Sequence, residues 1–206
     1  MESKLHYNST GQQLQGVLKT LMAAKEFTPF RLVGGTALSL LRGHRESIDI
    51  DLFSDAPYDS IDFGAIYEFL CNTFSYVDTN EYKVVGLGKS YYIGNSEEDC
   101  VKLDLFYTDK FIQEFILIDG IRLATVEEII AMKIDVISRV GRKKDFWDIH
   151  ELKLDYWDKF NIQFHCHPAF VFFRLCITES GMKRWGVRSY FPFNRVENLM
   201  RVTTFN

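Results

Sequence analysis

Two aspartates within an apolar run are the residues of this chain best suited to chemistry. Asp49 and Asp51 lie two positions apart in the segment SIDIDLF, residues 47–53. Alternate side chains of a β-strand share a face, so both carboxylates should project together from Cα atoms about 6 to 7 Å apart. Side chains at that spacing can converge on divalent ions that lie roughly 3.5 to 4 Å from each other. For the pair taken alone, two solvated aspartates on an exposed strand are the alternative.

A third aspartate repeats the pattern in VKLDLFY, residues 101–107. Lys102 and Asp104 alternate there with apolar residues, so Asp104 would join the other two carboxylates if the two strands are neighbours. Hard oxygen ligands of this kind suit Mg²⁺ together with substrate phosphates. We therefore predict a site for two Mg²⁺ ions, or Mn²⁺ in their place, at Asp49, Asp51 and Asp104. For Asp104 a structural role is an equal alternative.

A glycine pair precedes these aspartates, between an apolar strand-like segment and a short helical one. Gly34 and Gly35 would let the backbone approach a ligand closely, and the free N–H groups of the following helix would attract phosphate. We expect Thr36 to cap that helix and to offer its hydroxyl to the same phosphate. A tight connection without a ligand is the commoner role of such a turn.

A second group of charged residues falls on apolar helix faces further along the chain. Lys133 has isoleucine and valine neighbours three and four positions away, so it lies in an apolar stripe and needs an anionic partner, unless it extends to the surface. Asp145 and Asp148 fall on the inward side of the next predicted helix. Unpaired charge is costly there, so either aspartate could instead cap its helix or pair with a neighbouring arginine.

The spacing of Gly35-Thr36 and the later Asp49-Ile50-Asp51 resembles the nucleotidyltransferase superfamily, which usually has serine where this chain has Thr36. More specifically, LVGGTALSLLRGHRESIDIDLFS together with MKIDVISRVGRKKDFWDIHEL is similar to the AbiEii/AbiGii abortive-infection toxin family, nucleotidyltransferases of type IV toxin–antitoxin systems. The resemblance covers roughly residues 30–152.

This resemblance implies an activity and a set of roles. The enzyme would transfer NMP from an NTP to an acceptor hydroxyl, on tRNA or another cellular target, as a toxin of phage defence with a cognate antitoxin. Lys133 would contact the nucleotide phosphates, and Asp145 would act as a base or as the partner of Lys133. Phosphate binding would extend over a further group of residues: Gly34, Gly35, Thr36, Arg139 and Arg142.

Three other functions remain open from the residues alone. A nucleotidyltransferase of this size could modify a small molecule or a protein instead of RNA. A glycosyltransferase also uses an Asp-x-Asp pair, although it would leave the glycine turn, Lys133 and Asp145 unexplained. A non-catalytic module that only binds nucleotide is the third.

The elements that position these residues indicate an α+β fold. We expect a mixed, nucleotidyltransferase-like sheet with flanking helices over residues 1–124, and a mainly helical region packed on it over 125–206. Predicted helices cover about 14–22, 36–43 and 60–74, and Thr125 with Glu128 marks the start of another. Predicted strands cover 30–35, 47–53, 82–85, 90–93, 101–107, 111–118 and 121–123.

Composition limits the remaining possibilities. The chain has 206 residues, of which 47% are hydrophobic, so it can bury a substantial core. No apolar run is long enough for a membrane span and no secretory signal is evident, so we expect a cytoplasmic protein without a membrane partner. The segment HCHP, residues 165–168, contains residue types that bind zinc, but no second ligand pair lies at a suitable spacing. Acidic residues concentrate in 46–62 and basic residues in 139–144 and 181–206, a distribution suited to a phosphate-rich substrate.

Overall fold

The computed structural model describes residues 4–79, 86–160, 163–167 and 170–176, with side chains described up to residue 152 except at 138–140. The chain forms two compact units, Met1–Ile129 and Ile130–Asn206. The domain boundary that we predicted after residue 124 stays a prediction. Among the described helices, none combines the length and the apolar character that crossing a bilayer requires.

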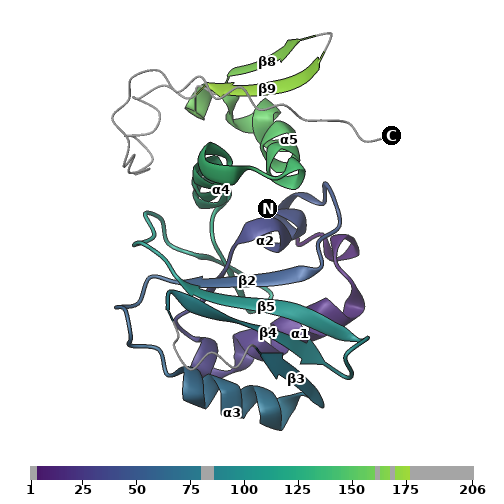
Figure 1. Ribbon diagram of the computed structural model, residues 1–206, viewed down its shortest axis with the longest axis vertical. Helices are drawn as coiled ribbons and strands as arrows, with labels where there is room; N and C mark the ends of the chain where they lie inside the picture. Colours follow the sequence, from purple (N-terminus) through teal and green to yellow (C-terminus); the bar gives the residue numbers. More distant parts are fainter. Residues whose placement is uncertain (1–3, 80–85, 161–162, 168–169, 177–206) are drawn as a thin grey trace. The chain divides into compact units, whose positions relative to one another are not determined.

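A mixed seven-stranded sheet forms the centre of the first unit, in the order β3-β4-β5-β2-β1-β7-β6. β2 and β5 run parallel at its middle, whereas β4 and β1 lie antiparallel to them on either side. Figure 1 shows β2, β5 and β4 side by side. The strands are β1 Arg31–Leu32, β2 Asp49–Ser54, β3 Tyr76–Thr79, β4 Gly88–Gly94, β5 Cys100–Tyr107, β6 Ile116–Ile118 and β7 Ile121–Leu123.

Helices pack around this sheet, which confirms the expected α+β class. The first-unit helices are α1 Gln12–Ala23, α2 Gly34–Arg42 and α3 Phe63–Thr73, with short 3-10 turns η1 Tyr7–Ser9 and η2 Lys25–Phe27. α1 buries the apolar face that its spacing predicted. Asp62 caps α3, because its carboxylate accepts a hydrogen bond from the Ala65 N–H at 2.9 Å. α2 ends at Gly43, whose φ of +67° gives the left-handed turn that favours glycine.

Alternation along β2 and β5 separates the core from the functional face. Ile50, Leu52, Leu103 and Leu105 are fully buried on one face of the sheet. The intervening residues of both strands are only partly buried and lie on the opposite face. The apolar core therefore sets which way the aspartates point.

α4 Val126–Val140 begins with half of the predicted capping box. The Thr125 hydroxyl accepts a hydrogen bond from the Glu128 N–H at 3.2 Å, as expected. The Glu128 carboxylate does not turn back to the cap; it accepts from the N–H groups of Ile112 and Gln113, at 2.7 and 3.0 Å. This side chain thus holds the segment before β6 against the start of α4.

Helices dominate the described part of the second unit, in which α4 is followed by α5 Lys143–Phe160. The structure then departs from the helical expectation, since β8 Gln163–His167 and β9 Phe170–Cys176 pair antiparallel. The sequence of β9 contains three phenylalanines and one valine, residue types that favour strands. The side chains of the HCHP segment and the basic stretch 181–206 lie outside the described residues.

The first unit also shows differences in the lengths of strands. β1 has two residues because α2 begins at Gly34, and β6 covers only the end of the predicted strand at 111–118. β3 lies at a position where no strand was predicted, while the predicted strand at 82–85 lies outside the described residues.

Candidate active site

The three predicted carboxylates share one face of the sheet. Asp51 of β2 and Asp104 of β5 are direct partners in the parallel register, and Asp49 is the partner of Lys102. Adjacent strands lie about 4.8 Å apart, so the three aspartates form a compact acidic group. The hydrogen bond from the Ser90 hydroxyl of β4 to Asp104 Oδ1, at 2.6 Å, confirms which face Asp104 occupies.

The glycine turn lies directly against this acidic group. Gly34 has a φ of +69°, and a Cβ added to it would overlap the Asp51 carboxylate. The adjacent Val33 N–H donates to the Asp51 carbonyl at 2.9 Å. A glycine is needed here both for the left-handed backbone and for the close approach of the carboxylate. The first turn of α2, with its N–H groups that have no helical acceptor, therefore begins beside Asp51.

Thr36 has a different role from the predicted cap. α2 is capped by Val33 without a side-chain bond, so Thr36 is the third residue of the helix and the prediction that it caps the helix is wrong. Its buried hydroxyl is within hydrogen-bond distance of the Ser47 hydroxyl, at 2.8 Å, and donates to the Asp49 carbonyl. Thr36 thus ties α2 to the start of β2 and helps to place Asp49. Phosphate binding by Thr36 stays a prediction.

Gly35 adjoins an arginine that the sequence analysis did not single out. A Cβ on Gly35 would lie 2.6 Å from a guanidinium nitrogen of Arg45 and 3.3 Å from the Ser47 hydroxyl. Arg45 also donates from Nη1 to the carbonyl of Glu46 at 2.9 Å. A cationic side chain therefore lies next to the glycine turn, where a phosphate was expected.

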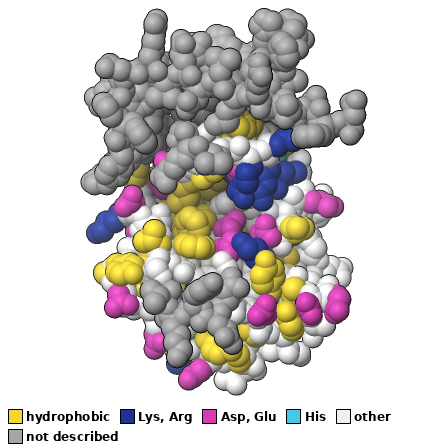
Figure 2. Space-filling model, viewed as in Figure 1, with side chains coloured by type: hydrophobic (Ala, Val, Ile, Leu, Met, Phe, Trp, Pro, Cys, Tyr) yellow, Lys and Arg dark blue, Asp and Glu magenta, His cyan; other side chains and the backbone are white. Residues whose placement is uncertain are grey.

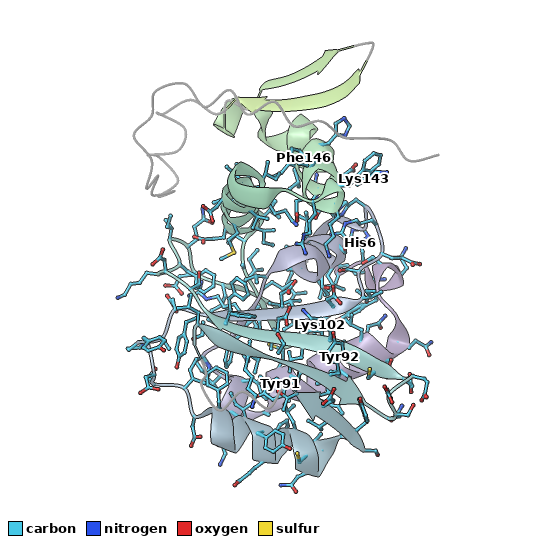
Figure 3. All side chains as sticks on the ribbon, in the orientation of Figure 1. His6, Tyr91, Tyr92, Lys102, Lys143 and Phe146 are labelled. Carbon is cyan, nitrogen blue, oxygen red and sulfur yellow. The ribbon has the colours of Figure 1, made fainter. Side chains whose placement is uncertain are left out.

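Lys102 was expected on the strand face of Asp104, but no role was predicted for it. Its ammonium forms an ion pair with Asp104 Oδ2, so Lys102 and Ser90 engage both oxygens of that carboxylate. Figure 3 shows Lys102 on β5 with Tyr92 of β4 beside it. Figure 2 shows basic side chains next to acidic ones near the middle of the surface in view. The spacing of two residues between Lys102 and Asp104 was the sequence signal for this contact.

The acidic surroundings keep this lysine charged. Partial burial lowers the pKa of Lys102, but the hydrogen bond to Asp104 and the charges of Asp104, Asp49 and Asp51 outweigh it. The resulting pKa lies above the ordinary lysine value. All three aspartates therefore act electrostatically on one ammonium group.

The three aspartates suit a divalent cation in their chemistry, and they share one face of the sheet. Carboxylate oxygens on one face are the donors that Mg²⁺ accepts. Over the ranges that the structure describes, however, no three His, Cys, Asp or Glu side chains converge closely enough to hold an ion. Asp104 is engaged by Lys102 instead. A cation would gain Asp104 Oδ2 only if Lys102 moved.

Two phenylalanines continue the same face beyond the carboxylates. Phe53 and Phe106 are register partners, two positions after Asp51 and Asp104. Their ring centroids lie 6.0 Å apart in an edge-to-face arrangement. The acidic group is therefore bordered by an aromatic pair that also escaped the sequence analysis.

The second unit holds a separate cluster of charges between α4 and α5. Lys133 is buried, and its Nζ lies 2.6 Å from Asp148 Oδ2 and 3.3 Å from Asp145 Oδ1. The expectation of a buried lysine with anionic partners is confirmed. Asp148 makes the shorter of the two contacts, so both aspartates are partners of Lys133.

Asp145 also binds the chain that precedes α5. Its Oδ2 accepts from the Arg142 N–H at 3.2 Å and from Arg142 Nε at 3.0 Å. Burial raises the pKa of Asp145, but the bonds to Arg142 and the charge of Lys133 outweigh that effect and leave the pKa below its ordinary value. Asp145 is therefore ionised at neutral pH. The side chain of Arg139 lies outside those described, and phosphate binding by Arg139 and Arg142 stays a prediction.

Solved structures share this fold. A Helicobacter pylori protein described as a nucleotidyltransferase is 24% identical to this chain, with a TM-score of 0.53 over 71% of this chain and 68% of its own. The H. pylori protein JHP933 is 23% identical, with a TM-score of 0.52 over 71% of this chain and 66% of its own. No curated protein matches the chain.

A family model identifies the chain more closely. The model described as nucleotidyl transferase AbiEii toxin, type IV toxin–antitoxin system, matches residues 16–173 of the 206. That span includes the glycine turn, the three aspartates and the Lys133 cluster. The chain is a nucleotidyltransferase and belongs to the AbiEii toxin family.

Proposed function

We propose that the protein transfers NMP from an NTP to a hydroxyl group of cellular RNA, with Asp49 and Asp51 as the principal metal ligands. The observation that carries this proposal is the contact of Asp51 with Gly34. It places the metal-binding type of side chain at the N-terminus of a helix, where phosphate binds favourably. A nucleotide triphosphate needs both features at one place.

The side chains have separate tasks in this proposal. Asp49 and Asp51 would hold Mg²⁺ or Mn²⁺, with Asp104 as the third ligand. A bound divalent cation would neutralise the triphosphate and favour in-line attack at the α-phosphorus. The N–H groups of Gly34, Gly35 and Thr36 would bind the outer phosphates, and the neighbouring Arg45 guanidinium supports this placement.

Lys133 and Asp145 enter the proposal through the family resemblance. Lys133 would interact with the nucleotide phosphates, and Asp145 would orient it or accept the proton of the attacking hydroxyl. The observation in favour of these roles is that both groups are charged and held by defined partners. A buried charged lysine kept in place by two carboxylates is suited to electrostatic work that requires little reorganisation.

The acceptor that we propose is RNA. RNA is supported by the concentration of basic residues in 139–144 and 181–206. A protein or small-molecule acceptor would use the same carboxylates. The proposed setting is a cytoplasmic toxin of phage defence, restrained by an antitoxin, since the family is one of toxin–antitoxin systems.

Label transfer tests the reaction. The full chain is incubated with each α-³²P-labelled NTP, Mg²⁺ and total RNA, and in parallel with a protein extract or without acceptor. We expect labelled RNA with wild type and none with Asp51→Ala. Asp78→Ala, the same change on the exposed part of β3, is the matched control and should retain transfer. Transfer by Asp51→Ala would refute the metal assignment, and labelled protein alone would replace the RNA acceptor. Sugar release from UDP-sugars would indicate a glycosyltransferase instead.

Growth of bacteria tests the toxin role. Induction of the wild-type chain should arrest growth, whereas Asp51→Ala should not, because toxicity would depend on nucleotidyl transfer. Equal toxicity of both chains would show that the effect does not arise from the transfer reaction.

A further inference from the structure

We infer that Lys102 is a built-in competitor of the divalent cation: its ammonium group occupies the carboxylate face of β2 and β5 and must leave Asp104 for that residue to bind metal. The inference rests on the proposed function, because it concerns the same three carboxylates. It assigns a role to a residue that is neither a metal ligand nor part of the glycine turn.

The position of Lys102 supports this role. It is the register partner of Asp49 and lies two positions before Asp104 on one strand face. The ammonium is paired with Asp104 Oδ2 rather than extended into solvent, while Ser90 holds Oδ1 of the same carboxylate. Lys102 therefore takes up the carboxylate oxygen that a third metal bond would use.

Partial exposure makes an exchange of partners feasible. The side chains of Lys102 and Asp104 are 35% and 16% exposed, so the lysine has room to swing away and its ammonium can be hydrated. A fully buried lysine would lose its only counter-ions on such a move. Two cations in contact with one carboxylate group would repel each other, so metal binding and the Lys102 contact oppose one another.

Competition between Lys102 and the divalent cation would favour binding of metal together with nucleotide. Three clustered carboxylates repel each other when no cation is present, and Lys102 relieves that repulsion in the free protein. It would also weaken the binding of metal alone. Metal that arrives together with a triphosphate brings additional phosphate ligands, so it would displace Lys102 more readily than the bare ion does.

Mn²⁺ binding to the full chain without nucleotide tests the inference, since free Mn²⁺ can be followed by electron paramagnetic resonance. Lys102→Met removes the charge and keeps the chain length, and Lys102→Gln is a second, polar variant in case the first folds poorly. We expect both to bind Mn²⁺ about tenfold more tightly than wild type, because one like charge is removed from a partly solvated site. Raising the salt concentration should reduce this difference in Mn²⁺ affinity, because salt screens the charge of Lys102.

Lys89→Met is the matched control. Lys89 lies on the neighbouring strand β4 but on the opposite face, with its ammonium 5.6 Å from the centre of the Tyr67 ring. Its removal should leave Mn²⁺ affinity at the wild-type value. Adding Asp51→Asn to Lys102→Met should abolish the gain, which locates the ion at these carboxylates.

A thermal readout is independent of activity. In EDTA, Lys102→Met should melt at a lower temperature than wild type, and Mn²⁺ should raise its midpoint more than it raises that of wild type.

Failure of the inference is distinguishable from failure of the proposed function. The inference is overturned if neither Lys102 variant binds Mn²⁺ more tightly than wild type, and metal-dependent transfer still stands if Asp51→Asn weakens Mn²⁺ binding. If the variants do bind more tightly at Asp51 but wild type labels no acceptor, the inference holds and the proposed function fails.

Discussion

Lys102 and Lys133 are both paired with aspartates, but their surroundings differ in exposure and in balance of charge. The side chain of Lys102 is 35% exposed and that of its partner Asp104 is 16% exposed. For Lys133 the figure is 7%, and for Asp145 and Asp148 it is 2% and 0%. The first cluster lies on a partly exposed sheet face of the first unit, and the second lies between α4 and α5.

The difference shows which charges can be exchanged. In the buried cluster, Lys133 is paired with Asp145 and Asp148, and Arg142 is paired with Asp145. Buried charges must remain matched, because an unmatched one costs several kcal/mol. On the sheet face, one lysine feels the charges of three aspartates. The partly exposed ammonium group of Lys102 can be replaced by another cation at lower cost than the buried ammonium group of Lys133.

Removal of each lysine should give the largest contrast between the clusters. Lys133→Met removes the ammonium group that two buried carboxylates share, so it should lower the free energy of unfolding by about 3 to 5 kcal/mol. Lys102→Met should cost less than about 1 kcal/mol, since partly exposed ion pairs contribute little. All three tryptophans lie between residues 147 and 185, so their fluorescence during urea unfolding reports on the second unit. Equal losses of unfolding free energy in the two variants, measured by urea unfolding with circular dichroism, would contradict the distinction between the buried and the partly exposed cluster.

The glycine turn should be the next most sensitive feature of the sheet-face cluster. Gly34→Ala forces a side chain into the left-handed region and against Asp51, so we expect about 2 kcal/mol of destabilisation and loss of label transfer. Gly16→Ala is the matched control, because its position in α1 leaves open space for a Cβ. Thermal melting followed by circular dichroism measures both variants. A Gly34→Ala protein as stable and active as wild type would show that the turn does not need glycine.

Substitutions of Thr36 separate the contribution of its hydroxyl group from that of its side-chain shape. Thr36→Val removes the bonds to Ser47 and the Asp49 carbonyl in a buried place, so it should cost about 1 to 2 kcal/mol. Thr36→Ser retains the hydroxyl and should lose less stability than Thr36→Val while retaining Mn²⁺ affinity. Amide exchange in β2 should accelerate in the valine variant alone. Unchanged exchange in that variant would place the link between α2 and β2 elsewhere.

The smallest predicted effect is the acid response of the buried cluster. The pKa of Asp145 is lower in the folded protein than its ordinary value, so its ionised form stabilises the fold. This contribution is complete above about pH 4, the ordinary aspartate value, and is lost as the pH falls through the lower folded value. Between pH 5 and 2, urea unfolding by tryptophan fluorescence should therefore depend more steeply on pH in wild type than in Asp145→Asn. Equally steep pH profiles for wild type and Asp145→Asn would argue that the pairing of Asp145 does not stabilise the fold.

Local patterns were sufficient for much of the architecture. The apolar spacing of α1, the Thr125 cap of α4 and the alternation in β2 and β5 are properties of short segments, and each was readable before the structure was known. The functional face followed from the same alternation, because Ile50 and Leu103 must enter the core. The boundaries of β1 and β6 were less predictable, since strand ends depend on pairing with neighbours.

What the sequence alone determined is therefore the identity of the acidic group and the side of each strand on which its members lie. Only the tertiary structure decided that β2 and β5 are parallel neighbours with Asp51 opposite Asp104, that Gly34 touches Asp51, and that Lys102 binds Asp104. These contacts join segments more than 15 residues apart, or select one partner among several charged neighbours. Side-chain periodicity is a local property, whereas strand register and the choice of counter-ion depend on how the whole core packs.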